Sequence, residues 1–167
     1  MLKLSKLSDY AGVVMAQIAR HPESAHAAPE LAASVGLPRP TVSKTLKLLQ
    51  KAGLLISRRG VQGGYLLARP ARSIRVSDII EAIDGPVAMT ACSHGGSDCD
   101  LAATCGVADN WQRVSVAIRQ LLDSVTLEHL AQREPLKLTP PRAETAVRRI
   151  SESLLVSDAR TTDATAR

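Results

Sequence analysis

The sequence has few aromatic side chains: its 167 residues include no Phe, one Trp and two Tyr. A core built from Leu, Ile, Val and Ala favours helices over the aromatic-rich strands of sandwiches and barrels. There is also no run of about 18 apolar residues of the kind that crosses a membrane. The N-terminus lacks the apolar stretch of a signal peptide, so we expect a cytoplasmic protein with no membrane partner.

Cysteine is scarce as well, and Cys92, Cys99 and Cys105 all lie in one stretch, ACSHGGSDCDLAATC. Its Gly, Ser and Asp residues predict a loop, where cysteines are not buried as small hydrophobic residues. In a reducing compartment, an odd number of clustered cysteines favours metal binding or redox chemistry over structural disulfides. Thiolates suit iron–sulfur clusters or zinc, and the short C-x2-4-C spacing of structural zinc sites is absent.

Other uses of these cysteines stay open. His94 would complete a Cys3His zinc site, and the thiols alone would serve as a redox switch. A thiol-dependent enzyme is the least favoured alternative, because there is no C-x-x-C pair and no nucleophile with a clear His and carboxylate partner.

Positive charge is in excess, with a formal net charge of +5 and a pI near 9.4, which fits a polyanionic partner such as DNA. Three amphipathic helical patterns occupy the first 53 residues, and the apolar stripe of the first comprises Leu4, Leu7, Ala11, Val14 and Ile18. A short turn at 36–38 joins the second pattern to the third. The third is expected to bury Val42, Leu46 and Leu49 and to expose a basic side. This is a helix-turn-helix pattern.

The next stretch, LLISRRGVQGGYLLA, predicts a hairpin in which Leu54–Ser57 pairs with Tyr65–Leu67. A basic hairpin after a helix-turn-helix is a wing, and Arg58 and Arg59 directly follow its expected first strand. A phosphate-binding loop is the competing interpretation, but the GK[ST] signature is absent and no helix follows directly.

A short helix over Val76–Asp84 and the cysteine loop precede a stripe of apolar residues at spacings of three and four. The stripe comprises Trp111, Val114, Ile118, Leu121 and Val125, and the outer side of the same helix is expected to carry Arg113, Arg119, Gln120 and Asp123. This rhythm predicts a long C-terminal dimerisation helix in a homodimer, although packing into the core of the same subunit gives a similar stripe. Thr126 is expected to start a final short helix.

The expected fold is therefore mainly α: a winged helix-turn-helix with a small β-hairpin wing and a long C-terminal dimerisation helix. The expected boundaries are 1–84 for the DNA-binding domain, 85–108 for the cysteine-rich cluster-binding loop, 109–131 for the dimerisation helix region and 132–167 for a linker and largely disordered tail.

Four stretches, LSDYA, GLPRPTVSKTLKLLQKAGLL, RGVQGGYLLARP and VSDIIEAIDGPVAMTAC, resemble the Rrf2 family over about residues 1–131. The chain is most similar to the iron–sulfur branch, especially to regulators of the SUF cluster-assembly system. The resemblance implies a homodimeric repressor of cluster-assembly genes, with one iron–sulfur cluster (2Fe-2S or 4Fe-4S) per subunit held by the three cysteines.

The fourth cluster ligand is implied by resemblance alone. Some members carry a histidine three residues after the last cysteine, where this chain has Ala108. In the nitric-oxide sensors of the family, an aspartate from the first helix of the partner subunit completes the cluster, and Asp9 matches it. Asp9 is therefore the first candidate, His94 the second, and a solvent or substrate-like ligand the third. The ordinary role for Asp9 is a helix-start carboxylate that interacts with the helix dipole.

The first turns of the third helix are expected to enter the major groove, with Arg39, Thr41, Ser43 and Lys44 as candidate contacts. The resemblance places Arg59 in a minor groove beside the half-site. Related members read a base with Glu and Gln where this chain has Ser43 and Lys44, so their operator sequence does not carry over.

Together, these predictions describe a sensor. Its cluster occupancy or redox state sets the geometry of the cysteine loop and hence the spacing of the two DNA-binding domains in the dimer. Two-fold symmetry predicts a pseudo-palindromic operator. A cluster-free interaction protein that has lost DNA binding is the remaining alternative.

Overall fold

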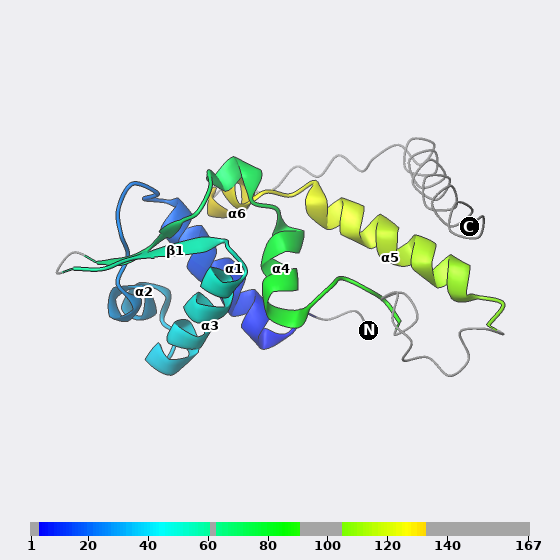
Figure 1. Ribbon diagram of the computed structural model, residues 1–167, viewed down its shortest axis with the longest axis horizontal. Helices are drawn as coiled ribbons and strands as arrows, with labels where there is room; N and C mark the ends of the chain where they lie inside the picture. The colour runs from blue at the N-terminus through cyan, green and yellow to red at the C-terminus, as the bar shows by residue number, and fades with distance from the viewer. Residues whose placement is uncertain (1–3, 61–62, 91–104, 133–167) are drawn as a thin grey trace, which may run out of the picture. The chain divides into compact units, whose positions relative to one another are not determined.

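The computed structural model describes residues 4–60, 63–90 and 105–132 (Figure 1). The elements are α1 (Lys6–Ala19), α2 (Ala28–Val35), α3 (Arg39–Lys51), β1 (Leu55–Arg58), β2 (Gly64–Leu67), the 3-10 turn η1 (Ala71–Ser73), α4 (Val76–Asp84), α5 (Ala108–Asp123) and α6 (Leu127–Ala131). This order confirms the predicted mainly α, winged-helix fold. None of the described helices has the length and apolarity needed to span a membrane.

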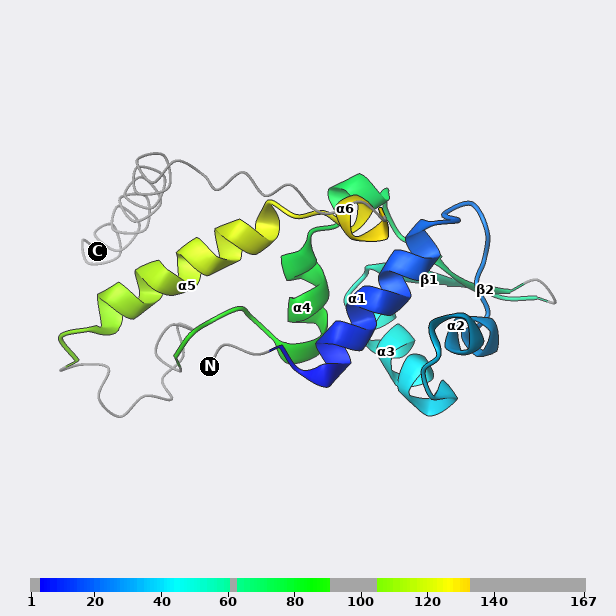
Figure 2. The same cartoon turned by 180° about the vertical axis from the view of Figure 1, so that it is seen from behind.

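The chain divides into two compact units. The first contains α1 to α4, the hairpin, α6 and the last two residues of α5, and the second contains the rest of α5. Within the first unit α1 packs against α3, α4 and α6 (Figure 2). The predicted domain boundaries stay predictions.

The helix α1 begins where Ser5 caps it, because the Ser5 hydroxyl accepts a hydrogen bond from the Ser8 amide at 3.0 Å. Ala11, Val14 and Ile18 of the predicted stripe are fully buried. Leu4, which was expected to share that stripe, is half exposed, since it precedes the cap and lies outside the helix.

The helix-turn-helix follows from local signals in the sequence. Gly36 ends α2 in the left-handed conformation, with φ of 68°, which glycine adopts without strain. The predicted inward face of α3, Val42, Leu46 and Leu49, is fully buried in the core. The basic side of the same helix is therefore left to solvent.

The wing is an antiparallel pair in which Leu55 lies opposite Leu67 and Arg58 opposite Gly64. Both strands differ by one residue from the prediction. The Leu54 amide donates to the Leu49 carbonyl at 3.0 Å and so completes the end of α3, which is why β1 starts one residue later.

The helix α4 spans Val76–Asp84, as predicted, and α6 starts after Thr126, whose hydroxyl accepts a hydrogen bond from the His129 amide at 3.4 Å. Ile79 in α4 and Leu127 in α6 are buried in the common core. These two helices complete the first unit around α1.

The predicted dimerisation stripe needs two corrections. Trp111, Val114 and Leu121 are 41–43% exposed on α5, and the dimer itself stays a prediction. Val125 lies beyond the helix and is 8% exposed, so it packs into its own subunit. Asp123, expected on the outer side, is only 22% exposed at its side chain, because it bonds to the start of α4.

Candidate nucleic-acid interface and metal site

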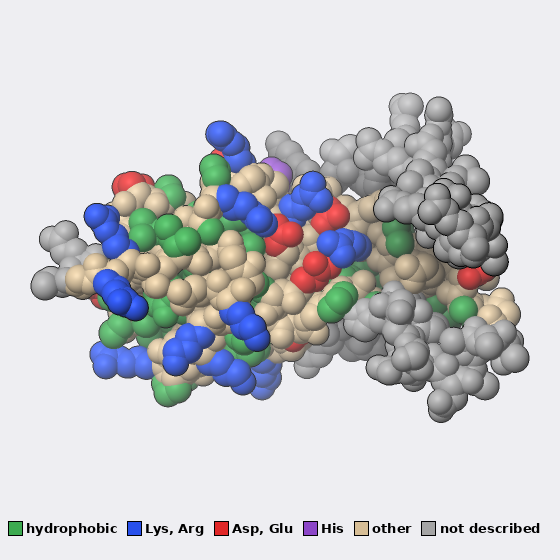
Figure 3. Space-filling model, in the orientation of Figure 1, with side chains coloured by type: hydrophobic (Ala, Val, Ile, Leu, Met, Phe, Trp, Pro, Cys, Tyr) green, Lys and Arg blue, Asp and Glu red, His purple; other side chains and the backbone are tan. Residues whose placement is uncertain are grey.

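The exposed side of α3 is basic. Arg39, Lys44, Lys47 and Lys51 are exposed, and the predicted contacts Thr41 and Ser43 are half-buried. Figure 3 shows Lys and Arg side chains gathered along the edge of the molecule that α3 forms. The helix therefore presents positive charge on the side away from its core contacts, as a helix that enters a DNA groove requires.

The N-terminus of α3 adds to this surface. Its N-cap is Pro38, and no side chain caps the helix there. Uncapped amide groups at a helix start carry the positive end of the helix dipole and attract phosphate. Thr45, by contrast, is buried, and its hydroxyl donates to the Thr41 carbonyl at 2.9 Å, so it is not available to DNA.

The two wing arginines, Arg58 and Arg59, are exposed at the end of β1. They share a hollow of about 640 Å³ with Glu23 and Glu30 from the segment before and at the start of α2. Among the described residues, no ion pair joins either arginine to Glu23 or Glu30, and both arginines are exposed toward a phosphate or a groove. The two glutamates are features that the sequence patterns missed, because only the fold brings them beside the wing.

The base of the wing is held by backbone contact. Residues His26 and Tyr65 exchange two hydrogen bonds, of 3.0 and 2.9 Å, which add a bridge to the hairpin. A Cβ on Gly64 would lie 2.5 Å from the His26 carbonyl oxygen. Glycine is required there because two backbone segments approach closely.

Of the predicted cluster ligands on the cysteine loop, the structure describes Cys105. Its thiol is free and half-buried, and its carbonyl accepts from the Ala108 amide at 3.3 Å, which places it just before α5. Cys92, Cys99 and His94 lie outside the described residues, so the convergence of the three sulfurs stays a prediction. A free, partly accessible thiol fits the soft-ligand chemistry of an iron–sulfur site.

Asp9 lies exposed in the first turn of α1, and its carboxylate has no hydrogen bond or ion pair with the rest of the described chain. It stands on a groove of about 470 Å³ whose walls include Val13, Ile80 and Leu130. Within 4–60, 63–90 and 105–132, no three His, Cys, Asp or Glu side chains form a metal-binding group. The structure thus presents Asp9 outward, and its predicted role as a ligand stays a prediction.

The chain is similar to known proteins in sequence and in fold. The model of a family described as "Rrf2: Iron-dependent Transcriptional regulator" matches residues 4–133. Protein aau3 of Rhizobium meliloti is 30% identical over 135 residues, which are 80% of this chain and 88% of that protein. The HTH-type transcriptional regulator IscR of Vibrio atlanticus is 32% identical over 130 residues, covering 77% and 75%.

Two solved structures are similar along most of the chain. CymR, the global cysteine regulator of B. subtilis, has a TM-score of 0.63 at 30% identity and covers 81% of this chain and 100% of its own. The IscR of T. potens has a TM-score of 0.60 at 31% identity, with 83% and 94% covered.

Proposed function

We propose, since this chain belongs to the Rrf2 family of transcriptional regulators, that it represses genes of iron–sulfur cluster assembly and does so according to the state of an iron–sulfur cluster. The observation that carries the DNA-binding part is the α2–turn–α3 unit followed by a basic hairpin, with the charged side of α3 exposed. The cluster and the target genes rest on the sequence resemblance and on the cysteine pattern.

In this proposal, Arg39, Thr41, Ser43 and Lys44 contact the major groove and Lys47 contacts phosphate. Arg39, Lys44 and Lys47 are exposed, and Thr41 and Ser43 are half-buried, whereas Val42, Leu46 and Leu49 are buried in the core. Arg58 and Arg59 would reach the adjoining minor groove from the wing.

Cys92, Cys99 and Cys105 would hold the cluster, with Asp9 of the partner subunit as the proposed fourth ligand and His94 as the alternative. A bound cluster would supply a group whose occupancy or redox state responds to iron, oxidants or nitric oxide. The position of Cys105 just before α5 links the ligand set to that helix through the chain. The Asp9 carboxylate, which is exposed beside an apolar groove and has no partner among the described residues, is suited to contact a second chain.

The proposed homodimer is supported by two apolar surfaces whose described side chains are exposed. One is the stripe of Trp111, Val114 and Leu121 on α5. The other is the groove on the first unit, where Leu4 and Val13 are 50% and 43% exposed. Apolar faces of this kind, rimmed by polar residues, commonly mark protein–protein interfaces.

Val114→Asp is expected to convert the dimer into a monomer, because it places a charge in the middle of the apolar stripe of α5. Sedimentation velocity at a fixed protein concentration measures the change. Gln112→Asp introduces the same charge at an exposed position on the other side of the helix and should leave the dimer intact. Equal sedimentation of the two variants would contradict the proposed seam.

The DNA-binding role is tested by selecting duplexes from a random pool with the oxygen-free, full-length protein and then measuring affinity. Arg39→Ala should weaken binding about 5- to 150-fold and relax the preference at one base pair, whereas Lys47→Ala should weaken binding to all sequences and lower the salt slope by about one. Arg113→Ala, on the exposed side of α5, is the matched control. Selection that yields no preferred, pseudo-palindromic duplex would contradict the proposal.

The alternatives give different results in the same preparation. A zinc site would bind metal without colour, and a thiol switch would bind neither iron nor zinc. The IscR of Vibrio atlanticus and CymR of B. subtilis are both named as regulators, which favours regulation over catalysis.

A further inference from the structure

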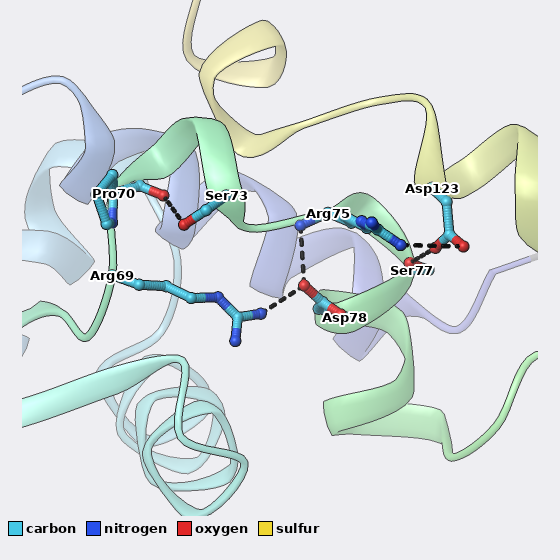
Figure 4. Close-up of polar contacts among 7 residues, drawn as sticks. All are labelled: Arg69, Pro70, Ser73, Arg75, Ser77, Asp78 and Asp123. Carbon is cyan, nitrogen blue, oxygen red and sulfur yellow. Dashed lines mark hydrogen bonds and ion pairs between the residues drawn. The ribbon is translucent and has the colours of Figure 1, made fainter.

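The C-terminal end of α5 is bonded to the first turn of α4. The Ser77 hydroxyl donates to the Asp123 carboxylate (Figure 4), and the Arg75 guanidinium lies 3.5 Å from the other oxygen of that carboxylate. Ser77 is fully buried. The Ser77 hydroxyl and the Arg75 guanidinium therefore hold the Asp123 carboxylate at the start of α4.

Backbone hydrogen bonds strengthen this junction. The Val76 amide donates to the Val125 carbonyl at 2.9 Å, and the Leu127 amide donates to the Ile74 carbonyl at 2.8 Å. The segment between α5 and α6 is thus paired on both sides of Arg75. Side-chain and backbone bonds together fix where α5 ends relative to where α4 starts.

A second carboxylate in the same turn connects α4 to the wing. One oxygen of Asp78 accepts from the Arg69 guanidinium at 2.5 Å and from the Arg75 amide at 2.9 Å (Figure 4). Arg69 lies two residues after the end of β2. Asp78 therefore contacts both the chain that leaves the wing and the N-cap of α4.

The two helices that meet at Asp123 also flank the cysteine segment, which is the predicted loop at 85–108. The cysteine segment leaves the C-terminal end of α4 at Gly85 and enters α5 at Ala108. The other ends of the same two helices meet at Asp123. Helices act as stiff elements, so a change imposed by the cysteine segment on either helix must be accommodated where they join.

We propose that Asp78 and Asp123 are positioning residues that connect the state of the cysteine segment to the wing. Asp123 holds the end of α5 to the first turn of α4, and Asp78 holds that turn to Arg69 behind β2. The inference rests on the proposed function, because it needs a cysteine segment whose state changes DNA affinity. It adds the residues through which that change reaches the DNA-binding surface.

A purely stabilising role is the competing explanation. The Asp78–Arg69 pair is 28% and 42% exposed and the Asp123–Arg75 pair 22% and 58% exposed, and partly exposed ion pairs contribute little to stability. Asp78 also caps α4, so its loss lowers stability somewhat. The test must therefore measure coupling, which a stabilising role leaves unchanged.

The experiment compares the full-length wild type with Asp78→Asn, Arg69→Gln, their double variant and Asp123→Asn. Each protein is prepared without oxygen, both metal-free and reconstituted with iron and sulfide, and its affinity for the duplex selected by the wild type is measured in both forms. The measured quantity is the ratio of the larger of these two dissociation constants to the smaller, so that a ratio of one means no response to iron. Glu128→Gln, which removes one negative charge from α6 outside the junction, is the matched control.

We expect the three single variants to retain the iron–sulfur absorption and to lower the wild-type ratio by about 2- to 30-fold. The double variant should lower this ratio no further than Asp78→Asn alone, because both substitutions remove the same contact between Arg69 and Asp78. Arg69→Gln breaks this contact without touching the cap of α4, so it decides the matter if Asp78→Asn fails to fold.

Variants that keep the wild-type ratio, or that lose the absorption itself, would overturn the positioning role. A wild-type ratio of one is a separate result, seen without any variant, and would overturn the proposed iron dependence on which the role rests.

Discussion

Cys105→Ala is expected to abolish the iron–sulfur absorption of the oxygen-free protein and to make its DNA affinity the same with and without iron. One of three proposed thiolates would be gone, and a cluster left with two cysteine ligands from the chain would be poorly held. A two-state regulator with a coupling of about 1–3 kcal/mol changes affinity about 5- to 150-fold, so this response would disappear entirely. Absorption spectra and DNA titrations of the reconstituted protein measure both effects.

Gly106→Ala is the matched control for this variant. A Cβ at Gly106 meets no atom within 4 Å, so the change alters the neighbouring position without removing a ligand, and colour and iron response should persist. Asp9→Asn should shift the spectrum without bleaching it if Asp9 is the fourth ligand. A coloured, iron-responsive Cys105→Ala protein would show that the cysteines do not bind a cluster together.

Gly64→Ala is expected to destabilise the protein by about 1–3 kcal/mol, as overpacking does, and to weaken DNA binding through the wing. The added Cβ would lie 2.5 Å from the carbonyl oxygen and 2.9 Å from the nitrogen of His26, both backbone atoms that cannot rotate away. The bridge between His26 and Tyr65 must open, and Arg58, which lies opposite Gly64, must move with it. Thermal or urea unfolding and titration with the selected duplex measure the two effects.

Gly12→Ala is expected to have the opposite effect on stability. A Cβ at Gly12 has nothing within 4 Å, and replacing glycine by alanine inside a helix favours folding by about 0.5–1 kcal/mol. If Gly64→Ala unfolded at the same urea concentration as the wild type, the close approach at the wing base would not constrain the protein.

Local patterns were sufficient for most of the helical fold. The bounds of α4 at Val76–Asp84 were predicted because an apolar face begins there and Gly85-Pro86 ends it. The inward face of α3 was predicted because the spacing of Val42, Leu46 and Leu49 matches the helical period. Both depend on residues close together in the chain.

The errors arose where distant segments meet. Val125 fits the heptad spacing of α5, yet it is buried in its own subunit, because the backbone pairing with Val76 draws this segment onto α4. Asp123 looks like a solvent-facing helix residue until Ser77 and Arg75 are placed beside it. Spacing along one helix contains no information about such partners.

By itself, the sequence determined the helical class, the helix-turn-helix with its wing and the candidate thiolate ligands, because period, caps and motif spacing are local properties of the chain. The tertiary structure alone decided that Glu23 and Glu30 line the same hollow as the wing arginines, that Gly64 lies against His26, and that Asp78 and Asp123 join the wing, α4 and the end of α5. Apart from Arg69 and Asp78, these neighbours are far apart in the chain, and only the packing of the core brings them together.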